Sequence, residues 1–134
     1  MPEPQTLERA RRDKAEGKAP ATQAGEFVRE EMHHIRGGKH GARSAKQAIA
    51  IGLSKARHAG VKLPPPRRGT VSEKTRRSAE RAYRKGQAGE RPSPKRSRAR
   101  LKALKHEGRG AASYKALSRQ ARTAARRRRH SARS

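Results

Sequence analysis

The chain has 134 residues and carries 37 lysines and arginines against 11 aspartates and glutamates, a net charge of +26 at pH 7. Leucine, isoleucine, valine and phenylalanine together number only 13, and cysteine and tryptophan are absent. So little apolar material argues against a walled substrate pocket and hence against an ordinary enzyme, and the lack of cysteine excludes disulfides and thiolate metal sites.

The first predicted element is a short polar helix over residues 6–16, within a polar N-terminal segment, residues 1–21. Thr6 is a candidate cap for this helix, and Gly17 ends it. Leu7 is the only large apolar residue in the helix. Because it has almost no apolar face to bury, we expect the helix to fray rather than to dock on the rest of the chain.

Residues 22–60 are predicted to form a helical hairpin, the ordered unit of the chain. Its helices cover residues 22–36 and 44–59, where apolar side chains recur at helical spacing and Ser44 with Gln47 makes a capping box. The expected packing residues are Phe27, Val28, Met32, Ile35, Ile49 and Leu53. Their burial hardly offsets the cost of ordering about 40 residues, so we expect support from a partner or from a homodimer through the hairpin.

A proline-rich linker, residues 61–69, follows the hairpin. Its three consecutive prolines, Pro64 to Pro66, favour polyproline II geometry and therefore a semi-rigid spacer. A proline-recognition ligand is the alternative interpretation of the same residues.

Residues 70–134 are predicted to form a basic arm with three further helices. Thr70 with Glu73 opens the first, Ser93-Pro94 opens a second that runs to about Glu107, and Ser113 caps a third that reaches towards Arg129. Their apolar stripes are thin, so we expect marginal helices that are partly disordered until phosphates neutralise their charge. The predicted fold class is mostly α: a small helical hairpin plus marginal basic helices.

The positive charge is concentrated in the C-terminal two-thirds of the chain. Residues 1–40 have a net charge of +1, residues 41–90 of +10 and residues 91–134 of +15. Such a chain repels itself unless a polyanion neutralises it. Arginine, whose forked donors match phosphate oxygens, outnumbers lysine 25 to 12, although a GC-rich genome would produce the same bias. The pattern favours non-specific nucleic-acid binding through phosphate contacts, with DNA preferred over RNA.

The candidate phosphate-binding residues are cations of the linker and the arm. They are Arg67, Arg68, Arg76, Arg77, Arg91, Lys95, Arg96, Arg98, Arg100, Lys102, Arg119, Arg122, Arg126, Arg127, Arg128 and Arg129. The last four form one contiguous block, which positions a protein on phosphates without reading sequence. Ser93-Pro94-Lys95-Arg96 resembles the Ser-Pro-Lys-Lys/Arg element of linker-histone tails, which docks in A/T-rich minor grooves; a plain helix cap is the alternative interpretation.

The histidines near the first glycine-rich turn are the only residues with metal-ligand spacing. Glu30 and His34 lie one helical turn apart and would make half of a zinc site. The simpler interpretation is that His33, His34 and His40 are surface histidines near a helix C-terminus, where positive charge is favourable. We find no catalytic constellation, so we expect no enzyme activity, no catalytic residue, no metal and no cofactor.

One stretch carries a family resemblance. Residues 38–66, GKHGARSAKQAIAIGLSKARHAGVKLPPP, resemble a core segment of small basic bacterial proteins classed as a domain of unknown function. Some of those proteins are labelled DNA-binding or histone-like on composition. With the preceding EFVREEMHHIR the resemblance covers about residues 22–69. It implies a bacterial origin, and it carries over no site residue.

These observations lead to the expectation of a bacterial nucleoid-associated or histone-like DNA-binding protein in the cytoplasm. The start, Met1-Pro2-Glu3-Pro4, lacks the features of a secretory signal, and no apolar run approaches the roughly 20 residues that span a bilayer, so we expect no membrane association. Two alternatives stay open. One is an RNA-binding or ribosome-associated protein, since backbone binding to RNA needs no aromatic platform. The other is a protein-interaction hairpin with a solubilising basic tail.

Overall fold

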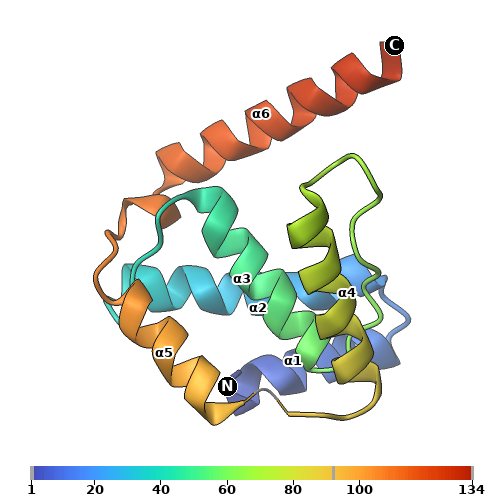
Figure 1. Cartoon of the computed structure of the whole chain (residues 1–134), viewed down its shortest axis with the longest axis vertical. Coiled ribbons are helices and arrows are strands. Elements are labelled where there is room, and N and C mark those ends of the chain that lie inside the picture. The colour runs from blue at the N-terminus through green and yellow to red at the C-terminus, as the bar shows by residue number, and fades with distance from the viewer. Residues whose placement is uncertain (1, 92, 134) are drawn as a thin grey trace.

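The computed structural model describes residues 2–91 and 93–133, and in that part of the chain six α-helices and one 3₁₀ turn form the fold (Figure 1). In chain order they are α1 (Pro4–Ala15), α2 (Pro20–Arg36), α3 (Ala45–His58), α4 (Glu73–Gln87), α5 (Pro94–Leu104), the 3₁₀ turn η1 (Gly110–Ala112) and α6 (Tyr114–Arg133). The described residues form no strand, so the prediction of a mostly α fold is confirmed. None of these helices is long and apolar enough to cross a membrane.

Three of the predicted helix caps are confirmed. The hydroxyl oxygen of Ser44 accepts a hydrogen bond from the amide of Gln47 at 3.1 Å, and those of Ser93 and Ser113 accept equivalent bonds at the starts of α5 and α6. Each bond satisfies one of the amides that a helix start leaves without a partner. Helix α5 ends at Leu104, three residues before the predicted end at Glu107.

The predicted cap of α4 is wrong. The helix begins two residues later than Thr70 would place it, and Ser72 is the cap, with its hydroxyl accepting from the amide of Thr75 at 3.2 Å. The Thr70 hydroxyl instead donates to the carbonyl of Arg67 at 2.6 Å. Thr70 and Ser72 could both cap the helix, but the hydroxyl of Thr70 is used by the turn of the preceding loop, which leaves Ser72 as the cap.

The prediction that the first helix would fray is also wrong, because α1 packs against α2. Thr6 is no cap: it is 3% exposed, and its hydroxyl donates to Glu30 Oε1 at 3.1 Å. The amide of Glu3 donates to the same oxygen at 2.6 Å. Ala10 is buried in the cluster that surrounds Phe27. The helix therefore docks through polar anchors and a small side chain, which a search for large apolar stripes does not detect.

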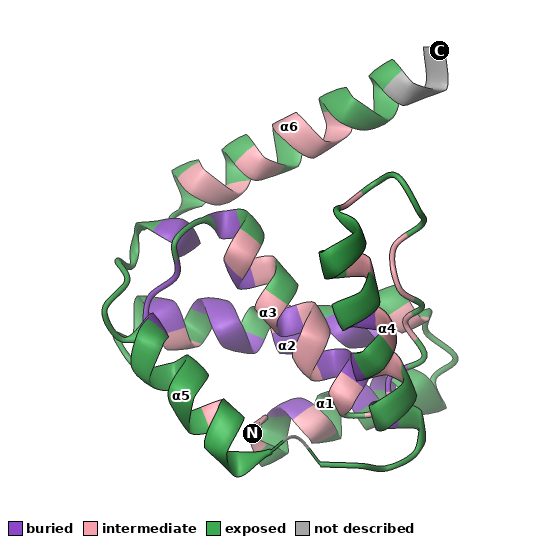
Figure 2. Ribbon diagram, in the orientation of Figure 1, coloured by how far each residue is buried: buried purple, intermediate pink, exposed green. Residues whose placement is uncertain are grey.

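Helix α3 runs back across α2 (Figure 1). Two small apolar clusters lie along this crossing. Figure 2 shows the buried residues gathered on these two helices and on the elements that touch them. Among the predicted packing residues, Phe27, Met32 and Ile35 are buried, and Val28, Ile49 and Leu53 are partly buried against them. Both clusters are completed from outside the hairpin, by Ala10 and Val61 in one and by Ala111 and Ala112 in the other.

The proline-rich segment lies against the end of α3. Val61 is 7% exposed, and the guanidinium of Arg57 donates to the carbonyls of Leu63 at 3.2 Å and Pro64 at 3.0 Å. Beyond this segment α4 returns to α3, where Gly86 packs so closely that a Cβ there would collide with the Arg57 carbonyl. The first half of the segment is therefore fastened to the helical body.

The two C-terminal helices are attached at one end each. The loop after α2 holds the end of α5, since the amide of Gly41 donates to the carbonyl of Leu104 at 2.8 Å. The start of α6 is held by Arg36, which donates to the Ala112 carbonyl at 2.9 Å and lies 4.8 Å above the ring of Tyr114. From there α6 continues away from the other helices, and its C-terminal end projects from the body (Figure 1).

Candidate nucleic-acid interface

The structure spreads the predicted phosphate-binding cations over several segments instead of one patch. Arg67 and Arg68 precede α4, Arg76 and Arg77 lie on α4, Arg91 follows it, Lys95, Arg96, Arg98, Arg100 and Lys102 lie on α5, and Arg119, Arg122 and Arg126 to Arg129 lie on α6. Except for Arg76, all of these residues are exposed. The helices that carry them lie at different sides of the body (Figure 1). A single ligand would therefore have to wrap the protein to contact them all.

The cations at the start of α4 are partly neutralised by acids of the same helix. Arg76 bonds Glu73 through Nε at 2.8 Å and approaches Glu80 at 3.3 Å, and Arg77 lies 3.6 Å from Glu73. The hydrogen bond from Arg76 lowers the pKa of Glu73 below its ordinary value, so this carboxylate stays charged. These two arginines are the weakest candidates among the predicted set.

The sixth helix carries more positive charges than any other described helix. It contains eight lysines and arginines and no acidic residue. Arg119, Arg122, Arg126 and Arg129 recur at spacings of three and four, which places them along one face of the helix. These four arginines are exposed, and beyond its first turns α6 projects away from the body (Figure 1).

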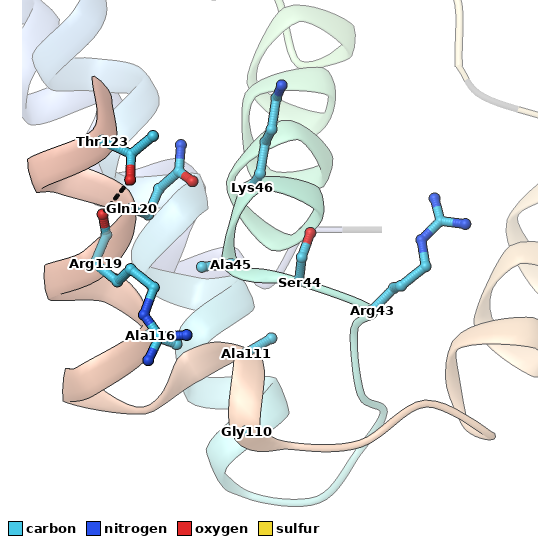
Figure 3. A pocket seen from close by; sticks show the side chains of 10 residues that line it. All are labelled: Arg43, Ser44, Ala45, Lys46, Gly110, Ala111, Ala116, Arg119, Gln120 and Thr123. Carbon is cyan, nitrogen blue, oxygen red and sulfur yellow. Dashed lines mark hydrogen bonds between the residues drawn. The ribbon is translucent and has the colours of Figure 1, made fainter. Parts of the chain in front are cut away.

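A second cationic feature was missed by the sequence analysis. Between α6 and the start of α3 lies a pocket of about 350 Å³ (Figure 3). It is lined by Arg43, Ser44, Ala45, Lys46, Gly110, Ala111, Ala116, Arg119, Gln120 and Thr123. In Figure 3 the Arg119 side chain runs along α6 towards Ala116, Lys46 extends along α3, and Arg43 extends away from α6.

The chemistry of this pocket suits an anion. Lys46 and Arg119 supply positive charge, and the N-terminus of α3 adds the positive end of its dipole, whereas the guanidinium of Arg43 is directed away from α6. Arg43 and Lys46 flank the predicted cap Ser44, and these two cations are the only feature of the sequence that points to an anion site here. The apolar spacing of residues 44–59 predicts packing for this segment, and no local pattern indicates that a residue of α6 lies beside it.

Besides burial, the positive charges of α4 and α5 lower the pKa of a histidine at the end of α3, His58. Nδ1 of His58 is buried and has no hydrogen-bond partner within the described residues. Burial lowers the pKa of His58, and the positive charges of Arg100 and Lys85 lower it further. The positive fields of α4 and α5 thus converge at this end of α3.

The His58 pKa predicts a loss of stability at mildly acidic pH. The native pKa lies below the ordinary value of 6.5, so the unfolded chain binds the proton more readily, and stability falls as the pH is lowered through 6.5. Denaturant midpoints measured from about pH 8 to about pH 5 should show this slope. It should flatten in His58→Gln and persist in His106→Gln, where an exposed histidine is removed. Equal slopes in the two variants would contradict the role of His58.

The interpretation of the other histidines as surface residues is wrong for His40. This residue is 5% exposed, whereas His33 is exposed and His34 is half-buried. Glu30, which with His34 is the alternative half-site for zinc, accepts hydrogen bonds from the amide of Glu3 and the hydroxyl of Thr6.

Comparison with known proteins gives one finding. Residues 11–68 match a family of unknown function (DUF6496). This range overlaps the stretch in which the sequence resembles a domain of unknown function, and the match says nothing about DNA binding. Neither a curated protein nor a solved structure matches the chain.

Proposed function

We propose that this protein binds nucleic acid without sequence preference, through phosphate contacts made by the basic residues of α5 and α6 and of the pocket beside α3. The observation that carries the proposal is the net charge of +25 over residues 41–134. Of the sixteen predicted cations, all but Arg76 are exposed. Exposed cations without acidic neighbours gain most from a polyanion, because each phosphate contact releases condensed counterions.

The arrangement of α6 supports phosphate contacts in particular. Its arginine face extends about 15 Å from Arg119 to Arg129 at 1.5 Å per residue, long enough to meet several phosphates of one strand. The anion-suited pocket lies at the same end of α6 as Arg119.

The aromatic residues support a backbone-reading mode of binding. Phe27 is fully buried, Tyr83 is half-buried, and Tyr114 is exposed with Arg36 over one face of its ring. Base stacking along a strand uses several free aromatic faces, and one exposed ring does not make such a platform, so affinity would come from charge. On this account the protein is a nucleoid-associated or histone-like factor that coats DNA in the bacterial cytoplasm.

The experiment is a competition assay with the full chain on a fluorescent DNA duplex. Unlabelled duplexes of scrambled sequence should compete as well as the original sequence, because phosphates carry no sequence information. A large loss on scrambling would contradict non-specific binding. Structured RNA of equal length is the second competitor. If it displaces the labelled duplex better than unlabelled duplex DNA does, the same surface binds RNA.

A further inference from the structure

A cluster of metal-ligand side chains lies where the end of α2 meets the loop that leads to α3. It consists of Glu31, His34 and His40, and one ligand atom from each lies within 4.8 Å of the others. Glu31 is fully buried and His40 is 5% exposed. The rings of the two histidines meet edge to face, with their centroids 6.0 Å apart.

Only one of the two carboxylate oxygens of Glu31 accepts a hydrogen bond in the described part of the chain. Its Oε1 accepts a short hydrogen bond from Nζ of Lys55. Its Oε2 is buried and receives no hydrogen bond in the described part of the chain, although Nε2 of His40 lies 3.2 Å away. A fully buried carboxylate oxygen without a hydrogen bond is costly, so a positively charged group is needed at this position.

The hydrogen bond on the other side of the His40 ring determines what Nε2 can offer. Nδ1 lies 2.9 Å from the carbonyl oxygen of Gly41, which can only accept, so Nδ1 carries the hydrogen. A neutral imidazole has no second N–H, and Nε2 therefore presents a lone pair to the lone pairs of Glu31 Oε2. The repulsion between them is removed by a cation held between the two atoms or by a second proton on the ring.

Hydrogen bonds in the surroundings of the cluster match those of metal-binding histidines. Such histidines hold their second ring nitrogen on a carbonyl or a carboxylate. His40 does so with Gly41, and His34 places Nε2 3.2 Å from Glu3 Oε1. Lys55, on the far oxygen of Glu31, balances part of the carboxylate charge and fixes its orientation.

An overlapping group, formed by Glu3, Glu30 and His34, is the weaker candidate. The Glu3 carboxylate is half-exposed and also bonds Lys39 at 3.1 Å. The Glu30 carboxylate already holds the N-terminal segment through two hydrogen bonds to its Oε1.

We propose that Glu31, His34 and His40 bind one divalent transition-metal ion, with zinc as the preferred ion. Two imidazole nitrogens and one carboxylate oxygen are a ligand set that Zn²⁺ favours, and three protein ligands leave a fourth position for water. The ion would tie α2 to the loop before α3. A chain whose two apolar clusters are this small gains stability from such a link, since metal binding adds directly to folding.

The test uses the full chain, freed of metal with a chelator and titrated at neutral pH. Calorimetry with Zn²⁺ should show one site per chain, and Co²⁺ should give the intense visible absorption of a four-coordinate ion. His34→Gln and His40→Gln should each lower the Zn²⁺ affinity at least about tenfold. The matched control is His33→Gln, which removes the exposed neighbouring histidine of the same helix and should bind as the unaltered chain does.

A measurement on the unaltered chain keeps the proposal testable if a buried variant fails to fold by circular dichroism. With equimolar Zn²⁺, the ¹⁵N resonance of His40 Nε2 should shift to that of a metal-bound nitrogen. Absence of a single site, or equal loss of affinity in the His33 control, would overturn the proposal. A proton retained on Nε2 of His40 in the presence of Zn²⁺ would also overturn it and would identify the cluster as a buried ion network.

Discussion

Replacing Arg126, Arg127, Arg128 and Arg129 by glutamine is expected to weaken DNA binding and to make it less dependent on salt. The block is exposed and lies at the projecting end of a helix that contains no acidic residue. Each lost phosphate contact lowers the slope of log affinity against log salt by about 0.9. Arg126 and Arg129 lie on the arginine face, while Arg127 and Arg128 project from other sides of the helix, so the quadruple variant should lower the slope by about 1.8 to 3.6. Fluorescence anisotropy with a DNA duplex at several salt concentrations measures this slope.

The matched control removes the same charge from the near-neutral head of the chain. Arg9, Arg11, Arg12 and Lys14 are exposed cations of α1, and their joint replacement by glutamine should leave the slope unchanged. If both quadruple variants reduce the slope equally, binding follows overall charge, and the assignment of the interface to α6 is wrong. An unchanged slope in the α6 variant would contradict the assignment directly.

Gly52→Ala is expected to destabilise the protein although alanine is the better helix former. A Cβ at position 52 of α3 would meet the backbone Cα of Val28 in α2 at 2.7 Å and its Cγ2 at 2.9 Å. Backbone atoms cannot move aside without separating the two helices on which the core rests. We therefore expect a loss of about 1–3 kcal/mol, the usual cost of overpacking, against a helix-propensity gain of about 1 kcal/mol at most.

Gly25→Ala is the control, and its effect should have the opposite sign. Gly25 lies within α2, and a Cβ there would meet nothing within 4 Å. The alanine should stabilise the protein by about 0.5–1 kcal/mol, because the unfolded chain loses flexibility and nothing is displaced. Urea midpoints of the two variants give both signs. A Gly52→Ala variant at least as stable as the parent would contradict the close packing of α2 on α3.

Local signals were sufficient to predict most of the helices. Proline at the first helical turn of α5 and the hydroxyl caps Ser44, Ser93 and Ser113 act within a few residues, so the sequence alone reveals them. The cap of α4 was misplaced because Thr70 and Ser72 offer the same chemistry, and only the turn of the preceding loop decides between them. The docking of α1 was missed because Thr6 anchors it to a carboxylate 24 residues away.

In the candidate sites too, features that depend on local sequence were predictable, and features that depend on tertiary contacts were not. The exposed arginines of α5 and α6 were predictable, because so many like charges cannot be buried and must face solvent. The neighbourhood of Arg119 and Lys46 depends on how α6 returns to the start of α3, which no local pattern encodes. The cluster around Glu31 depends on Lys55, 24 residues further along the chain, and on a loop that brings His40 back to α2.

The salt dependence of duplex DNA binding by the full chain tests the phosphate-contact proposal most directly. If about eight phosphates are contacted, log affinity should fall against log salt with a slope near −7. A slope shallower than about −2 would mean that no more than about two phosphates are neutralised and would contradict the account.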